Sequence, residues 1–366
     1  MSSKVYFITS RIIKQKGLLE KFAQLLEYLS LDFFDKNSSV LIKTHFGEEG
    51  NTAFISPLYI RKVVDFVKEK KANPFIGDTN TLYRGDRKSR VTHLELAHTH
   101  RFNYANLQET IVILDGLKSE FSKKVAIQKK YFQTVDLAGE FVNCDAAIIL
   151  SHVKGHIVAG LGASLKNLAM GLGTRTQKQK MHGDIKPSLN HKKCIQCKKC
   201  IQICPPEAIT LKNNKIEIDL DNCIGCAECI THCPTGAIKI LWNETPKKLA
   251  EKITETAYAA HKIKQNKIYY FNFIIDVTPD CDCMNWSDNA VVNDIGILAS
   301  KDPIAIDKAS YDLVNKAKKL ANSVLENKEG EVFKLMNNST FPETQFNYGA
   351  EIGLGNTEYE LIELEW

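Results

Sequence analysis

The sequence predicts an α/β protein: a domain with a mainly parallel sheet, into which a small α+β cysteine-rich module is inserted. Two observations indicate this fold. Strand and helix patterns alternate near the start and return near the end, and between them lies an internal repeat of different character. We expect 1–186 and 243–366 to form the two parts of the α/β domain, and 187–242 to form the module. Two independent flanking domains are the alternative.

The first strand–helix–strand unit begins with the apolar run Val40–His45, which is typical of a buried strand. Ser56 is placed to cap a helix whose first position is Pro57. Apolar residues then recur at helical spacing, at Ile60, Val63, Val64 and Val67. A second strand, Phe75–Gly77, follows and ends at Asp78. Two strands joined through a helix pair in parallel, so the unit indicates a parallel sheet.

Further apolar patterns extend this architecture on both sides of the cysteine-rich stretch. Short runs predict strands at 110–114, 146–150, 268–277 and 295–299. Helical spacing predicts helices at 18–29, at 164–170, from 249 onward and at 305–318.

Composition excludes several classes of protein. Of the 366 residues, 44% are hydrophobic and 25% charged, and the net charge of +5 favours no polyanion partner. No basic face with interleaved aromatic residues is visible, so we expect no nucleic-acid partner. The start does not suit a secretory segment, and the longest apolar stretch, 268–277, is too short for a bilayer. We expect a cytoplasmic protein without a membrane partner.

Eight of the eleven cysteines fall within the 40 residues 194–233. Cytosolic thiols are kept reduced, so this crowding indicates metal binding. Each run has the form C-x2-C-x2-C-x3-C-P, in which three thiolates surround one cluster and the fourth is directed to the partner cluster. The first cluster is then held by Cys194, Cys197, Cys200 and Cys233. The second is held by Cys223, Cys226, Cys229 and Cys204.

The rival interpretation of these runs is zinc, whose sites usually offer separated C-x2-C pairs. The triple spacing favours two [4Fe–4S] clusters. This stretch resembles bacterial-type two-cluster ferredoxins, and the resemblance implies a low-potential electron relay with a protein as electron donor or acceptor.

The glycine-rich segment 151–173 directly follows a predicted strand. His152 and His156 lie four residues apart, and Lys166 follows. Ligands of open α/β sheets bind at the carboxyl ends of strands, and glycine lets the backbone approach a ligand closely. A glycine-rich connection with two surface histidines is the alternative. The lysine-rich run 178–193 is most simply a solvated linker, although it would also suit an anionic substrate.

The segment 279–294 is the second candidate region. Cys281 and Cys283 flank Asp282 and would bind an additional metal, perform thiol redox chemistry or be inert. Weaker candidates, for which capping or solvation is as good an explanation, are His45, Glu48, Glu49, Asp78 and Thr79.

Long motifs that contain several glycines are distributed over most of the chain. They are KTHFGEEGN (43–51), FIGDTNTLYRG (75–85), SHVKGHIVAGLGASLKNLAMGLG (151–173), PDCDC…NDIGILASKDPIAIDKAS (279–310) and YGAEIGLGNTEYELIEL (348–364). With the cysteine runs, they resemble the domain of unknown function 362 family, in the branch with an internal ferredoxin module. The resemblance implies an anaerobe-type iron–sulfur protein with an α/β domain, and it brings no known reaction. It places within recurring segments the candidates His152, His156, Lys166, Cys281 and Cys283.

Three functions are compatible with these features. In a redox enzyme, electrons would pass from a soluble donor through the clusters to a substrate or metal centre in the α/β domain. Lys166 or a histidine would supply protons or bind a small anionic substrate, and Cys281 with Cys283 would bind a metal or a redox intermediate. An electron-transfer subunit or carrier without its own catalytic site is the first alternative. A non-redox enzyme or a sensor is the second.

Overall fold

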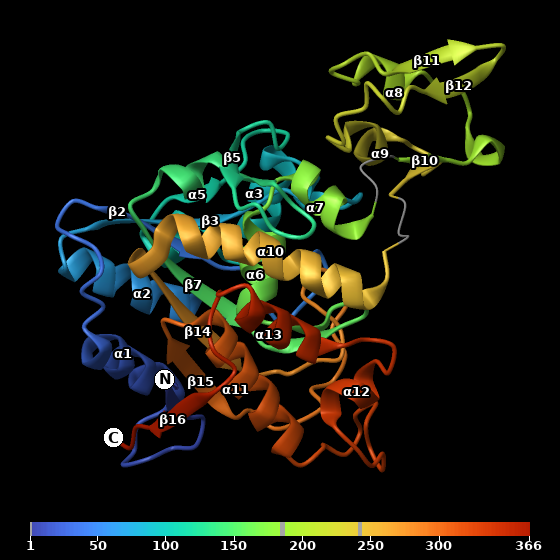
Figure 1. Cartoon of the computed structure of the whole chain (residues 1–366). Coiled ribbons are helices and arrows are strands. Elements are labelled where there is room, and N and C mark those ends of the chain that lie inside the picture. The colour runs from blue at the N-terminus through green and yellow to red at the C-terminus, as the bar shows by residue number, and fades with distance from the viewer. Residues whose placement is uncertain (1, 184–186, 241–243) are drawn as a thin grey trace.

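The computed structural model describes residues 2–183, 187–240 and 244–366. An eight-stranded sheet lies at its centre, in the order β16–β1–β15–β14–β7–β2–β3–β4 (Figure 1). The strands are β1 (Ser3–Thr9), β2 (Ser39–Lys43), β3 (Asn73–Asp78), β4 (Ile111–Ile113), β7 (Ala146–His152), β14 (Ile268–Ile274), β15 (Gly296–Ser300) and β16 (Tyr359–Glu363). β15 pairs antiparallel with β1 and β14, and the other neighbours pair in parallel. The predicted α/β class with a mainly parallel sheet is confirmed.

The first strand–helix–strand unit forms as the sequence predicts. β2 leads into α2 (Pro57–Glu69), and α2 leads into β3. The Ser56 hydroxyl accepts a hydrogen bond from the Leu58 N–H and caps the helix. The side chains predicted at helical spacing are all buried: Ile60, Val63, Val64 and Val67. β2 ends at Lys43, two residues before the predicted end, which leaves the next residues free to leave the sheet.

Two hydrophobic clusters divide the core. One contains side chains of α1 (Leu18–Leu29) and α2, which pack against each other. The other contains side chains of α6 (Ser164–Leu172), α10 (Pro246–Lys264) and α11 (Pro303–Lys316). Successive residues of the central strands β7 and β14 alternate between the two clusters, so helices cover both faces of the sheet, as Figure 1 shows.

Shorter elements complete the body around the sheet. The helices are α3 (Arg90–Thr99), α4 (Tyr104–Leu107), α5 (Gly139–Asn143), α7 (Arg175–His182), α12 (Val332–Met336) and α13 (Pro342–Glu351), with 3₁₀ turns at Asp86–Lys88, His191–Lys193 and Gln265–Lys267. Two hairpins are formed by β5 (Ser122–Ala126) with β6 (Thr134–Ala138) and by β8 (Lys154–His156) with β9 (Gly160–Gly162).

The cysteine-rich segment 187–240 builds small sheets of its own. They pair β11 (Ile209–Lys212) with β12 (Lys215–Ile218), and β10 (Ser188–Leu189) with β13 (Ile238–Lys239). Two short helices, α8 (Lys199–Gln202) and α9 (Glu228–His232), complete it, and Figure 1 shows the segment at one side of the body. β7 and β14, which precede and follow it in the chain, are neighbours in the large sheet.

The predicted boundaries at 186/187 and 242/243 touch residues 184–186 and 241–243, which lie outside the described residues. The division into domains therefore stays a prediction. Within the described ranges, no helix has the length and apolar character needed to cross a bilayer.

Candidate functional site

A cavity of about 780 Å³ opens at the carboxyl ends of the central parallel strands. The residues after β2, the last residue of β3 and the end of β7 all line it. Because parallel strands end at the same edge of a sheet, side chains from distant parts of the sequence meet there. The loop after β14 supplies a further wall through Cys281, Asp282 and Cys283.

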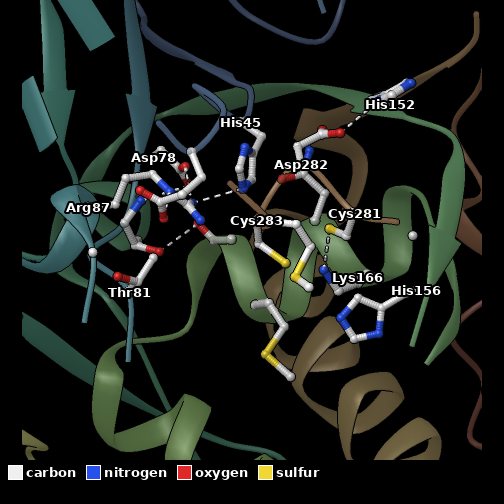
Figure 2. Close-up of a pocket in the computed structure, with 18 of the residues that line it drawn as sticks. His45, Asp78, Thr81, Arg87, His152, His156, Lys166, Cys281, Asp282 and Cys283 are labelled. Carbon is white, nitrogen blue, oxygen red and sulfur yellow. Dashed lines mark hydrogen bonds and ion pairs between the residues drawn. The ribbon is translucent and has the colours of Figure 1, made fainter. Parts of the chain in front are cut away.

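One corner of the cavity gathers four of the predicted residues. The Lys166 ammonium lies 3.1 Å from the Cys281 sulfur, and His156, Cys281 and Cys283 bring one ligand-type atom each to within 4.8 Å of the others. Figure 2 shows the two sulfurs, the Lys166 amine and the His156 ring side by side. We call these four residues the thiol corner. Its members come from β8, α6 and the loop after β14.

Local sequence features place these elements. The Gly155 N–H donates to the Thr278 carbonyl at 2.9 Å, and a Cβ on Gly155 would lie 2.1 Å from the Pro279 carbonyl oxygen. Only glycine therefore lets the β8 backbone touch the cysteine loop. Asp307 fixes the start of α6, because its carboxylate accepts from the N–H groups of Ser164 and Leu165 at 2.9 and 2.8 Å.

Asp282 points away from the thiol corner into a buried charged contact. Its carboxylate lies 2.7 Å from His152 Nδ1 and 2.9 Å from Lys154 Nζ. The other ring nitrogen of His152 lies 2.9 Å from the Ile275 carbonyl, so the ring is held between a carboxylate and a backbone carbonyl. Burial alone would raise the pKa of Asp282, but His152 and Lys154 hold it well below its ordinary value. His152 thus positions the loop and does not face the sulfurs (Figure 2).

The two thiols of the corner differ in their ionisation. The hydrogen bond from Cys283, together with the nearby Lys166 ammonium, lowers the pKa of Cys281 well below its ordinary value. The same hydrogen bond and burial raise the pKa of Cys283. Burial alone would lower the pKa of Lys166, but the two sulfurs outweigh it and raise that pKa. The arrangement favours a thiolate at Cys281, stabilised by an ammonium and a neighbouring thiol.

The opposite side of the cavity is a network of buried charges. Lys43 pairs with Asp78 at 2.9 Å, and Arg87 pairs with Glu48 at 3.1 Å. The Arg87 guanidinium also contacts His45 Nε2 at 2.8 Å (Figure 2). Three of the weaker candidates, His45, Glu48 and Asp78, are therefore held in paired contacts. Burial alone would raise the pKa of Asp78, but Lys43 and the other cations outweigh it and hold that pKa below its ordinary value.

Lys178 belongs to the cavity and not to a solvated linker. Its ammonium donates to the Thr79 hydroxyl at 2.8 Å and to the Asn80 carbonyl. Burial lowers the pKa of Lys178 to about 8. The sequence-based interpretation of 178–193 as a solvated run is therefore wrong at its first residue, which lies on α7. Residues 184–186 of that run lie outside the described part of the chain.

Sequence reasoning missed Arg87 and Tyr83 as members of the site. Tyr83 accepts a hydrogen bond from Arg87 at 2.6 Å and donates to the Cys283 carbonyl at 3.2 Å. Lys43 could have been recognised from the sequence as part of a buried polar site, because a lysine inside a buried strand needs a charged or polar partner. Arg87 gave no such signal, since it lies in a charged stretch that looks solvent-exposed.

Two small cavities, each of about 20 Å³, divide the eight cysteines of the runs into two sets of four. One cavity is lined by Cys194, Cys197, Cys200 and Cys233. The other is lined by Cys204, Cys223, Cys226 and Cys229. Four thiolates on one zinc ion would lie about 3.8 Å apart, given Zn–S bonds of about 2.3 Å. Among the described residues, no three cysteines of the runs approach each other within 4.8 Å. This wider spacing fits a polynuclear cluster better than a single ion.

A short segment joins the cysteine cavities to the large one. Leu82 is 3% exposed and packs in the same hydrophobic cluster as Cys200 and Cys233, while it also lines the large cavity. Arg84 donates to the carbonyl of Pro234 at 3.3 Å. The residue between them, Tyr83, donates to the Cys283 carbonyl in the loop after β14. Residues 82–84 therefore connect the cysteine-rich segment with the large cavity.

A family model described as "Domain of unknown function (DUF362)" matches residues 40–312, which is most of the chain. The chain belongs to this family. The range that matches DUF362 includes the thiol corner, the buried charges and both cysteine runs. The eight cysteines at 194–233 are compatible with an iron–sulfur protein.

Two solved structures match this DUF362 protein over part of their length and share little sequence with it. A Thermotoga maritima protein is 10% identical, with a TM-score of 0.38, over 72% of this chain and 52% of that chain. The lactate racemase apoprotein from Thermoanaerobacterium thermosaccharolyticum is 14% identical, with a TM-score of 0.44, over 86% of this chain and 57% of that chain. This chain thus spans little more than half the length of either protein. No curated protein matches it.

Proposed function

We propose that the chain is an iron–sulfur redox enzyme that exchanges electrons with a small anionic substrate bound in the large cavity. In this proposal, 187–242 is a ferredoxin-like module inserted into the α/β domain and holds two [4Fe–4S] clusters. When bound, each such cluster accepts or donates one electron at a time. Thiolate ligands need a reducing compartment, so we propose a cytoplasmic location.

The arrangement of cysteines supports two clusters with exchanged fourth ligands. Cys233 lines the cavity of the first run, and Cys204 lines the cavity of the second. This is the division expected for a two-cluster ferredoxin. The same arrangement fits two zinc ions poorly, because the sulfurs of each set surround a cavity and do not converge on one point.

The contact segment 82–84 is the observation on which the enzyme proposal depends. Pro234 follows Cys233, and its carbonyl accepts the hydrogen bond from Arg84. The neighbouring Tyr83 donates to the Cys283 carbonyl. One residue pair thus links the ligand set of the first cluster to the thiol corner through two hydrogen bonds. A carrier that only docks a partner would have no use for such a link to an interior cavity.

The charges of the cavity support an anionic substrate. Lys43, Lys154 and Arg87 each pair with a carboxylate. Lys166, in contrast, contacts a sulfur, and Lys178 contacts a hydroxyl and a carbonyl. Both ammonium groups line the cavity, and among the described residues neither donates a hydrogen bond to a carboxylate. A carboxylate or phosphate ester would pair with the Lys178 ammonium in a low-dielectric site.

An exposed apolar side chain follows the first cysteine of each run. Ile195 is 64% exposed and Ile224 is 53% exposed, and Cys197 is an exposed thiol. A protein electron donor that covers these side chains would approach the clusters on the outer side of the segment. We propose such a donor as the partner.

Anaerobic reconstitution tests the proposal. Dithionite should reduce the iron-loaded protein and give low-temperature EPR signals. After removal of dithionite, small carboxylates and phosphate esters that act as acceptors should reoxidise it, which is followed by visible absorbance. Lys178→Met should slow this reoxidation at least tenfold without changing iron content, and Lys301→Met, at an exposed lysine, should not.

Two results would contradict the proposal. Clusters that stay EPR-silent under dithionite would rule out electron delivery. Reduced clusters together with an equal reoxidation rate in Lys178→Met and wild type would favour the carrier.

A further inference from the structure

We propose that Cys281 and Cys283 form a redox-active dithiol–disulfide pair that stores two electrons inside the cavity. The inference rests on the proposed function, because it needs a low-potential one-electron donor of the iron–sulfur class. It assigns to the thiol corner a covalent redox role in place of an additional metal ion.

The backbone around the two cysteines brings them close together. The Met284 N–H donates to the Cys281 carbonyl at 2.9 Å, so 281–284 is a tight turn. A turn shortens the span between alternate residues below the roughly 7 Å of an extended chain, towards the 4.4–6.8 Å range that disulfides bridge. The two sulfurs already lie within 4.8 Å of each other. Rotation of the side chains would bring the sulfurs closer still.

The turn is held from both sides, which keeps the sulfurs adjacent in either redox state. The Glu48 N–H donates to the Asp282 carbonyl at 3.0 Å, and Tyr83 donates to the Cys283 carbonyl at 3.2 Å. The buried Asp282 carboxylate is in turn clamped by His152 and Lys154. A reduced pair in such a frame stays preorganised for reoxidation.

The surroundings of the sulfurs are unfavourable for a metal ion. Nδ1 of His156 accepts hydrogen bonds from the N–H groups of Val158 and Ala159, at 3.2 and 2.9 Å. The neutral ring therefore carries its proton on Nε2 and offers no lone pair there. The Lys166 ammonium, 3.1 Å from the Cys281 sulfur, would also repel a cation bound to that sulfur. The same two groups, an N–H donor and an ammonium, suit a thiolate.

The redox step balances within these groups. The S–S bond between Cys281 and Cys283 breaks when it takes up two electrons and one proton. It gives a Cys281 thiolate, which accepts a hydrogen bond from the Lys166 ammonium, and a Cys283 thiol, which carries the proton. In reverse, loss of two electrons and one proton forms the S–S bond again. Two one-electron centres would supply or accept one electron each.

A reductive titration of the anaerobic iron-loaded protein tests the inference. The oxidised wild-type protein should take up about four electrons, two for the clusters and two for the pair. Cys283→Ser should take up about two, at unchanged iron content. Cys144→Ala is the matched control, because Cys144 is a buried thiol hydrogen-bonded to the Phe141 carbonyl in the α/β core; it should match wild type.

Alkylation after an acid quench measures the redox state of the Cys281–Cys283 pair directly in the wild-type protein. Peptide mass spectrometry should find Cys281 and Cys283 unlabelled after oxidation and both labelled after reduction. Uptake of about two electrons by the wild type, with EPR-active clusters, would overturn the inference and leave the proposed function standing. So would one non-iron metal per chain that is lost in Cys283→Ser. EPR-silent clusters would overturn the proposed function, and dithiothreitol with alkylation would still decide the state of the pair.

Discussion

The cysteine-rich segment and the cavity both present thiols, but they assemble them in different ways. In 187–240 the eight cysteines come from two short runs and are separated by two or three residues within each run. In the cavity, two cysteines meet Lys166 and His156, which lie more than a hundred residues earlier in the chain. Local sequence therefore defines the first site, and only the finished sheet defines the second.

The two regions also differ in what stabilises them. The segment has a small hydrophobic cluster, which Leu82 of the α/β body joins and whose buried members include Cys200, Cys229 and Cys233. The α/β body has two large clusters on either side of the sheet. In the proposed function this small core contains the metal ligands, so it would depend on the metal, because binding free energy becomes folding free energy. The cavity, in contrast, is held by buried ion pairs that need no metal.

The largest expected effect is the loss of a cluster from the cysteine-rich segment, with the α/β body left intact. Cys204→Ala removes the ligand that, in the proposed function, the first run gives to the second cluster, so the protein should lose about half of its iron although the second run is intact. Iron analysis and EPR of the reduced protein measure this. The circular dichroism of the α/β body should change little. Loss confined to the cluster of the first run would contradict the exchange of ligands between the runs.

Next in size is the removal of the buried charge that holds the cavity loop. Asp282→Asn keeps the shape of the side chain but leaves His152 and Lys154 without a countercharge. The free energy of unfolding should fall by about 3–5 kcal/mol in urea titrations. Asp65→Asn is the control: Asp65 pairs with Arg61 at 2.7 Å, but its side chain is 40% exposed, so the loss should stay below about 1 kcal/mol. Equal losses would show that burial of the pair has no influence.

The smallest effect is a dependence on pH that the cavity should show and the surface should not. The pKa of Lys178 is about 8 in the folded chain and returns to its ordinary, higher value on unfolding. Between these values the unfolded chain binds more protons, so the free energy of unfolding rises with pH. Relative to wild type, Lys178→Met should therefore be more stable at pH 7 than at pH 9.5, by up to about 2 kcal/mol.

Urea midpoints at the two pH values measure the Lys178 effect. Lys318→Met, at an exposed lysine, is the control and should show the same difference from wild type at both pH values. A constant difference for Lys178→Met as well would mean that its ammonium is not desolvated.

Much of the fold could be predicted from the sequence, because local residue patterns determine it. The cap at Ser56 and the buried face of α2 follow from spacing alone. Strands β1 and β16 were missed, since β1 gains its partners β15 and β16 only from the far end of the chain. The antiparallel direction of β15 was also unpredicted, because direction depends on a connection through tertiary structure.

The candidate site divides in the same way. Cys281, Cys283, Lys166 and His156 were expected to be functional, and the structure brings them together. Their roles could not be read, because they depend on which neighbour each atom faces. His152 belongs to the same segment as His156 but turns to Asp282, and no sequence spacing encodes that difference.

The pairing of β7 with β14 has a consequence for the order of assembly. The whole cysteine-rich segment is synthesised before β14, which completes the middle of the sheet by pairing with β7. β15 can pair with β14 only after that, and β1 can then pair with β15. β1, which is synthesised before the other strands of this sheet, is thus among the last to find its neighbours, and its pairing requires closure of a long loop. During that interval the cysteine runs are already synthesised, so the proposed clusters would be able to form before the sheet closes and the cavity is buried.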